Sequence, residues 1–216
     1  PIHTVSLDEY WIDSTEVTNA MYATFLNEMG NQTEGGVAWL DAQSPRVLIT
    51  NKSGEWQPRP NWDNYPIVAV SWFGANAYCT WAGRSLPTEA QWEFAAKGSE
   101  GFRFPWGNAG PDCDHARFKG CGTSPVEVGS LTLGATPLGV FDLAGNVAEW
   151  VNDRYAPDYY LQSPTHNPTG PSNGYYRVIR GGYWGSIFLP LQTSNRDWAG
   201  ADTYEGYIGF RCVMTP

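Results

Sequence analysis

The chain has little positive charge and few histidines. Its 13 lysines and arginines stand against 22 acidic residues, which gives a formal net charge of −9, and it has only 3 histidines. No basic run occurs, so the sequence argues against binding to nucleic acid or to an anionic membrane surface. No apolar stretch approaches the length of a membrane span, and no signal peptide stands at the start. We expect no membrane insertion by this domain, which we take to be part of a larger chain.

Cysteine is also scarce, with 4 residues in the chain and none between Cys121 and Cys212. Cys113 and Cys121 flank a short polar loop, where a local disulfide is the natural pairing. Cys79 and Cys212 lie far apart and would tie a helix to the C-terminal strand. The alternative is four reduced, buried thiols, which so small a residue tolerates well. We favour at least one disulfide, and with it an extracytoplasmic or cell-surface location.

Turn residues and aromatic residues are abundant, with 24 glycines, 16 prolines, 11 tryptophans and 12 tyrosines. This composition predicts an aromatic core, short elements and much loop. Apolar residues at helical spacing follow three polar residues that can cap a helix. Thr88 and Gln91 have the pattern of a capping box. The predicted helices begin after Thr18, Ser71 and Thr88 and end at Gly30, Gly83 and Gly98.

Strand-like segments are predicted at 1–17, 47–50, 177–184 and 207–213, whereas residues 185–206 are interpreted as a loop. No linker, internal repeat or low-complexity segment divides the chain. The sequence therefore predicts one α+β domain spanning 1–216, with little regular secondary structure.

The stretch from Gly139 to Asp153 is the most informative part of the chain. Gly145 permits a tight turn, and Asp142 and Glu149 flank it with carboxylates. Two carboxylates together with turn carbonyls suit a hard cation such as calcium. The alternative is a structural turn whose carboxylates cap backbone N–H groups.

A series of motifs runs along the whole chain in one order. They are Trp11-Ile-Asp with Glu16-Val-Thr-Asn19, Pro66-Ile-Val-Ala-Val-Ser-Trp72, Ala77-Tyr-Cys-Thr-Trp81, Leu86-Pro-Thr-Glu-Ala-Gln-Trp-Glu93, Phe104-Pro-Trp-Gly107, Gly145-Asn-Val-Ala-Glu-Trp150, Arg180-Gly-Gly182 and Gly209-Phe-Arg-Cys212. In these motifs the sequence resembles the formylglycine-generating enzyme, or sulfatase-modifying factor, domain. The resemblance implies that family's variant of the C-type lectin fold, with two to three helices and a small central antiparallel sheet.

The resemblance also assigns structural roles to several residues. Cys79 and Cys212 match the family's long-range disulfide. A structural calcium site is implied at the carboxylates of Asp142 and Glu149 and at the carbonyls of Gly145 and Val147. A second calcium site of the family falls at Arg117, whose positive charge would repel a cation. We expect that second site to be empty and its role to be taken by a Cys113–Cys121 bridge.

The catalytic positions depart from the family. Active members use two cysteines that hold copper, because thiolates are soft ligands for Cu(I). Ser186 and Leu191 stand at or near those positions here, so no copper and no catalytic residue are expected. The scattered His3, His115 and His166 are interpreted as exposed loop residues. Asp153, Asp197 and Asp202 are interpreted as turn residues rather than as general acids or bases.

We therefore interpret the chain as a non-catalytic module that binds a protein or a small molecule through the surface of residues 183–206. One branch of the family, the variable proteins of diversity-generating retroelements, varies this part of the fold. The alternatives are a formylglycine-generating-type oxidase or another metal-dependent enzyme, and a passive structural domain of a larger protein such as a kinase or lipoprotein. The predicted ligand-binding residues are Tyr183, Trp184, Gly185, Ser186, Ile187, Phe188, Leu189, Pro190, Trp198, Ala199, Gly200, Thr203, Glu205 and Gly206.

Overall fold

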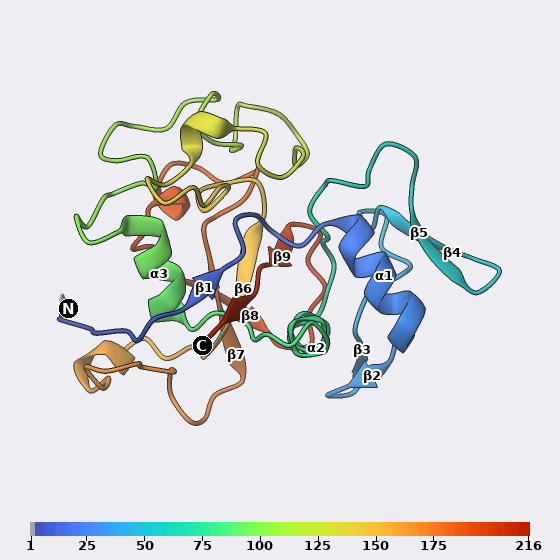
Figure 1. Cartoon of the computed structure of the whole chain (residues 1–216), viewed down its shortest axis with the longest axis horizontal. Coiled ribbons are helices and arrows are strands. Elements are labelled where there is room, and N and C mark those ends of the chain that lie inside the picture. The colour runs from blue at the N-terminus through green and yellow to red at the C-terminus, as the bar shows by residue number, and fades with distance from the viewer. Residues whose placement is uncertain (1–2) are drawn as a thin grey trace.

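The structure is a computed structural model that describes residues 3–216. The first two residues of the predicted opening strand lie outside the described residues. The rest of that segment contributes only the two-residue strand β1 (Trp11–Ile12), which pairs with β10 (Val213–Met214). A segment near the beginning of the chain therefore lies beside its last strand, and Figure 1 shows β1 in the middle of the molecule, near the end marked C.

The three predicted helices are confirmed, together with their caps. The hydroxyl of Thr18 accepts a hydrogen bond from Met21 N, and the Ser71 hydroxyl does the same for Gly74 N. Thr88 and Gln91 form the complete capping box. Each cap satisfies backbone N–H groups that have no partner inside the helix. The helices are α1 (Asn19–Met29), α2 (Trp72–Trp81) and α3 (Glu89–Lys97).

A four-stranded sheet runs through the middle of the molecule in the order β8-β7-β6-β9 (Figure 1). The pairs β8–β7 and β7–β6 are antiparallel, whereas β9 pairs with β6 in parallel. The apolar residues of β6 are buried, and β7 places Val178 and Ile179 in the core. The strands are β6 (Ala148–Arg154), β7 (Tyr176–Arg180), β8 (Asp197–Gly200) and β9 (Ile208–Phe210).

The interpretation of residues 185–206 as a continuous loop was wrong, because β8 lies within it. The strand forms through pairing with β7, in which Ile179 faces Asp197 and Val178 faces Trp198. Asp197 therefore belongs to a strand, and Asp153 lies in β6, so neither is the predicted turn residue. Pairing between distant segments, which local residue preferences do not encode, overrode the loop-like composition.

Smaller elements surround the sheet. Figure 1 shows α3 on one side of it, and α1 with the hairpin of β4 and β5 on the other. None of the helices within residues 3–216 has the length and apolar character needed to cross a membrane. The remaining elements are β2 (Thr33–Glu34), β3 (Val37–Ala38), β4 (Ile49–Lys52), β5 (Glu55–Pro58), η1 (Thr132–Gly134), η2 (Tyr159–Leu161) and η3 (Leu189–Leu191).

Two disulfides link the cysteines. Cys79 in α2 bonds to Cys212, across 133 residues of sequence, and Cys113 bonds to Cys121 around the local loop. The described chain has no free cysteine. Both bridges are compatible with an extracytoplasmic location.

Candidate ligand-binding pocket

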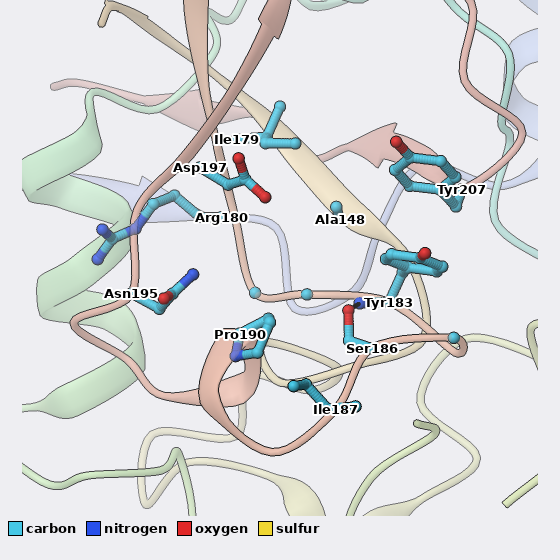
Figure 2. Close-up of a pocket in the computed structure, with 13 residues that line it drawn as sticks. Ala148, Ile179, Arg180, Tyr183, Ser186, Ile187, Pro190, Asn195, Asp197 and Tyr207 are labelled. Atoms are coloured by element: carbon cyan, nitrogen blue, oxygen red, sulfur yellow. Dashed lines mark hydrogen bonds between the residues drawn. The ribbon is translucent and has the colours of Figure 1, made fainter. Parts of the chain in front are cut away.

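A cavity of about 340 Å³ opens where the chain leaves β7 and returns through β8 (Figure 2). Gly181 and Gly182 turn the chain at the end of β7, both with positive φ values, 91° and 68°. A side chain at Gly182 would also press on the backbone of Pro190, 3.1 Å from an ideal Cβ. Glycine is therefore required here both by the backbone conformation and by the close approach of the opposite segment.

A tight turn forms the next part of the wall. Ser186 N donates to Tyr183 O at 2.8 Å, and the Ser186 hydroxyl accepts from Tyr183 N at 3.0 Å. Ser186 is buried and its hydroxyl is used inside the turn. Leu191, near the second cysteine position of the family, is fully buried against Phe104 and Ala144. Both positions are thus occupied by side chains that stabilise the fold.

The lining of the cavity combines aromatic, apolar and polar side chains. The rings of Tyr183 and Tyr207 stack with centroids 4.2 Å apart and planes at 21°. Figure 2 shows Asp197 and Asn195 on the side of the cavity opposite Ser186 and Ile187. In residues 3–216 the two tyrosine hydroxyls and the side-chain amide of Asn195 make no hydrogen bond. They remain available to a ligand.

An ion-pair cluster behind the pocket holds its walls together. Arg180 lines the cavity, but its guanidinium turns toward α3 (Figure 2), where it donates to Glu89 at 3.1 Å and Glu93 at 2.7 Å. It also donates to Thr193 O at 2.5 Å, and Arg196 donates to both oxygens of Glu89. One end of α3 therefore fixes both β7 and the segment that leads into β8.

The charges of this cluster offset one another. Burial alone would raise the pKa of Glu93, but Arg180 and Lys97 hold that pKa below its ordinary value. The carboxylate is therefore ionised and offsets the Arg180 charge. Arg180 Nε is nevertheless buried without a hydrogen-bond partner.

The structure divides the predicted ligand-binding residues into two groups. Tyr183, Gly185, Ser186, Ile187 and Pro190 line the cavity. The side chains of the others do not: strand alternation puts Trp198 on the face opposite Asp197, and there it stacks on Tyr155 at 4.3 Å. The predicted residues outside the lining are Trp184, Phe188, Leu189, Trp198, Ala199, Gly200, Thr203, Glu205 and Gly206.

Several members of that second group have other roles. Phe188 packs edge-on against Phe104 at 5.3 Å, and Arg103 lies over its ring. A side chain at Gly206 would collide with Arg46, 2.4 Å from an ideal Cβ. Ile187, Phe188 and Leu189 are exposed to 58%, 38% and 59%, so they form an apolar rim beside the cavity.

Sequence reasoning missed several lining residues. Asn195 was assigned to the loop of residues 185–206, Asp197 to a turn and Tyr207 to a strand. The signal that could have identified them is the pairing of β8 with β7, which sets the side-chain alternation at Asp197. That pairing is visible only in the fold.

The turn at 139–150, predicted to bind calcium, is densely hydrogen bonded. Asn146 donates to Glu16 at 2.9 Å and accepts from Val126 N at 2.9 Å. Asp142 accepts from Gly129 N at 2.6 Å and has a positive φ of 62°. Glu16, 130 residues from Asn146, therefore belongs to this turn although the sequence did not place it there.

Glu149 is fully buried and already paired. Arg211 donates to its two carboxylate oxygens at 2.7 and 2.8 Å, and Trp92 Nε1 donates at 2.8 Å. Trp92 and Arg211 thus fix the orientation of the carboxylate. This pairing uses part of the acceptor capacity that the calcium prediction assigned to Glu149.

Buried carboxyl groups outnumber the cationic side chains around the turn. Glu16, Asp142 and Glu149 face the single guanidinium of Arg211. Burial, followed by the nearby Asp142, raises the pKa of Glu16 well above its ordinary value, and burial also raises the pKa of Asp142. The second oxygen of Glu16 is buried without a partner. A hard cation would relieve this excess, so the donor chemistry fits calcium.

The carboxylates do not form a complete metal site by themselves. Nowhere in 3–216 do three or more acidic, histidine or cysteine side chains gather in an arrangement that could hold a metal. A cation at this turn would therefore need backbone carbonyls, for which Gly145 and Val147 are the candidates.

At the position of the family's second calcium site, which the sequence predicts to be empty, the guanidinium of Arg117 lies inside the loop. Its Nε donates to Ser124 O at 2.8 Å, and it also donates to Cys121 O. The side chain thus binds the kind of carbonyl oxygens that a cation would bind. The Cys113–Cys121 bridge closes the same loop.

The architecture defines the class of the protein, which is the C-type lectin-like fold: a small mixed sheet with few helices and long ordered loops. More particularly, the chain belongs to the sulfatase-modifying factor enzyme 1-like domain family, whose pattern matches residues 1–216. The family predicted from the sequence motifs is thereby confirmed.

Three known proteins are similar to this chain in sequence or in fold. The chain is 36% identical over 216 residues to the serine/threonine-protein kinase Pkn1 of Chlamydia trachomatis, covering 99% of this chain and 34% of the kinase. It is 33% identical to the formylglycine-generating enzyme of Streptomyces coelicolor, covering 99% of this chain and 80% of the enzyme. The solved structure of Treponema denticola variable protein 1 superimposes with a TM-score of 0.76 at 24% identity, covering 99% of this chain and 87% of that one. The chain spans about a third of the length of the Chlamydia kinases it matches.

Proposed function

We propose that this domain is a non-catalytic ligand-binding module that uses the cavity between the 181–190 turn and β8. The observation that carries the proposal is the cavity itself. Ser186, at the first cysteine position of the family, lines it with a hydroxyl already used in a turn, while uncommitted polar groups of Tyr183, Tyr207 and Asn195 face the ligand space. An apolar wall with a few free polar groups is typical of a small-ligand site.

The binding proposal is tested by a fragment screen observed through protein NMR. We expect hits to shift the amide signals of residues 181–187 and 195–198. Ile187→Arg, which places a long charged side chain at the mouth, should abolish those shifts. Trp198→Ala, on the opposite face of β8, is the matched control and should leave them unchanged. Absence of any hit at these amides would contradict the proposal.

The absence of catalysis is tested separately. We expect no formylglycine in a cysteine-containing sulfatase peptide incubated with the protein and Cu(I) under oxygen, as followed by mass spectrometry. The Streptomyces enzyme serves as the positive control. Conversion of the peptide by this protein would establish the alternative function, that of an oxidase.

We further propose one structural calcium, held by Asp142 and Glu149 with the carbonyls of Gly145 and Val147. The excess of buried carboxylate around the turn supports it. Bound there, calcium would neutralise charge and fix the turn that leads into β6. No reaction step is assigned to it.

The setting of the domain is also a proposal. We propose that residues 1–216 form one extracytoplasmic domain of a larger chain, because two disulfides stabilise it and related sequence occupies a third of the Chlamydia kinases. Labelling by a membrane-impermeant reagent in intact cells tests the location.

The exposed rim of Ile187, Phe188 and Leu189 supports one more specific version, a hypervariable receptor of a diversity-generating retroelement. This version expects a near-identical template repeat beside the gene, differing only at adenines. A gene neighbourhood without such a repeat or a reverse transcriptase would contradict it.

A further inference from the structure

One charge in the pocket has no counterpart. Asp197 lines the cavity and forms no ion pair in the described part of the chain. One of its oxygens accepts from Trp198 N at 2.8 Å, and the carboxylate points into the cavity (Figure 2). Arg180, the other charged residue of the lining, is bonded instead to Glu89 and Glu93. The lining therefore presents an uncompensated negative charge.

The aromatic wall of the cavity also favours a cationic ligand. The face of a tyrosine ring attracts a cation, because its quadrupole is negative above the plane. Tyr183 is stacked on Tyr207, which fixes both rings at the cavity. Burial raises the pKa of Tyr207 to about 12, and Glu205, Tyr183 and Asp197 add to the effect. The hydroxyl of Tyr207 therefore stays neutral.

The size and the floor of the cavity limit the ligand further. A volume of about 340 Å³ is near the lower end of the range of small-molecule sites, roughly 300–1,000 Å³. Ile187 and Pro190 supply apolar surface on the side opposite Asp197 (Figure 2). Such a site suits a short alkyl chain that ends in a positive charge.

We propose that the pocket binds a primary alkylammonium group of the size of a lysine side chain, with Asp197 as its counter-ion. This inference rests on the proposed binding function and specifies its ligand class. The ammonium donates to the Asp197 carboxylate and to the side-chain oxygen of Asn195, which lies on the same side of the cavity (Figure 2). The alkyl stem packs on Ile187 and Pro190.

The test compares two probes that differ only in the ammonium group, Nα-acetyl-lysine methylamide and Nα-acetyl-norleucine methylamide, in NMR titrations at pH 7 and low salt. We expect the lysine probe to shift the amides of 181–187 and 195–198 and to bind at least about tenfold more tightly than the norleucine probe. The affinity of the lysine probe should also fall as salt is added.

Asp197→Asn keeps an acceptor for Trp198 N but removes the charge, and it should weaken the lysine probe by about tenfold. Asp202→Asn is the matched control, because Asp202 is bonded to Tyr175 and lies outside the lining. It should change the affinity by less than about twofold.

Three results would overturn the assignment: equal affinity for the two probes, an unchanged affinity in Asp197→Asn, or no binding of the lysine probe. If uncharged fragments still shift the same amides, the proposed binding function stands and only the cationic ligand class fails. If no fragment of any class does so, the binding function fails as well.

Discussion

Two turns that touch each other handle buried charge in opposite ways. The 117–124 loop contains its own cation, because the Arg117 guanidinium donates to Ser124 and Cys121 carbonyls. The 139–149 turn gathers carboxylates around one arginine, and an oxygen of Glu16 remains without a partner. The two meet where Asn146 N donates to Arg117 O at 2.8 Å. The first loop thus holds a guanidinium among its own carbonyls, whereas the second turn has three buried carboxyl groups and only the guanidinium of Arg211.

The largest effect is expected from removing the one guanidinium of the second turn. Arg211→Met leaves Glu149 buried and unpaired and deletes bonds to the Asp13 and Phe141 carbonyls. Loss of one partner of a buried pair costs about 3–5 kcal/mol, which urea denaturation would show. Arg84→Met is the control, since its pair with Asp13 is about a quarter exposed and contributes about 0–1 kcal/mol. Equal losses in the two variants would contradict the importance of Arg211.

Removal of the internal cation of the 117–124 loop should destabilise the protein. Arg117→Met deletes two charged hydrogen bonds and should lower the free energy of unfolding by about 2–3 kcal/mol. Calcium should not restore it, because the loop has no carboxylate to bind the ion. Restoration by calcium would show that the two turns are interchangeable.

A double-mutant cycle sharpens this point. In Gly122→Ala an ideal Cβ would lie 1.9 Å from Arg117 Nη2, so the substitution should destabilise the protein less when Arg117 is already Met. Gly120→Ala is the control, because it also has a positive φ, 102°, but nothing lies within 4 Å of its Cβ position. Strict additivity of Gly122→Ala and Arg117→Met would mean that the guanidinium does not fill the loop.

Calcium should stabilise the second turn. Binding only to the folded state adds about 2.7 kcal/mol at a free concentration of 100 times Kd. Asp142→Asn keeps an acceptor for Gly129 N but removes a charge. Calcium should therefore stabilise this variant by less than it stabilises the unmodified protein. Thermal unfolding in calcium and in chelator measures both. Superimposable curves for the unmodified protein would contradict the calcium proposal.

A separate effect, on the pH dependence of stability, is expected from a carboxylate that is remote from both turns. Burial raises the pKa of Asp153 to about 7, against about 3.9 in the unfolded chain. Between these values the folded state keeps a proton that the unfolded state has released. Stability should therefore fall as pH rises from about 4 to about 7, by up to about 1.4 kcal/mol per unit.

Asp153→Asn mimics the protonated acid and should remove this part of the slope. The difference between the two pH profiles isolates Asp153 from Glu16 and Asp142, whose raised pKa values act in the same direction. Parallel profiles would show that Asp153 is not the titrating group.

The sequence by itself determined the family and the locally encoded parts of the fold. The three helices begin where their N-caps predict, because a cap such as Thr88 satisfies N–H groups only three residues away. Gly30 and Gly98 end α1 and α3 as predicted, whereas α2 ends with Ala82 as its C-cap, one residue before the predicted Gly83. The glycines of the turns were recognisable for the same reason. The likeness of the motifs also gave the fold class and the disulfide between Cys79 and Cys212.

The tertiary structure decided which side chains meet. Asp197 reaches the cavity and Trp198 does not, because the register of β8 against β7 sets the alternation. Glu16 joins Asn146 and the 139–149 turn only through packing across 130 residues of sequence. The positive charge of Arg117 could be read from the sequence, but its donation to the loop carbonyls required the folded loop. Local preferences depend on neighbours in the chain, whereas a pocket and a charge cluster depend on segments that become neighbours only after folding.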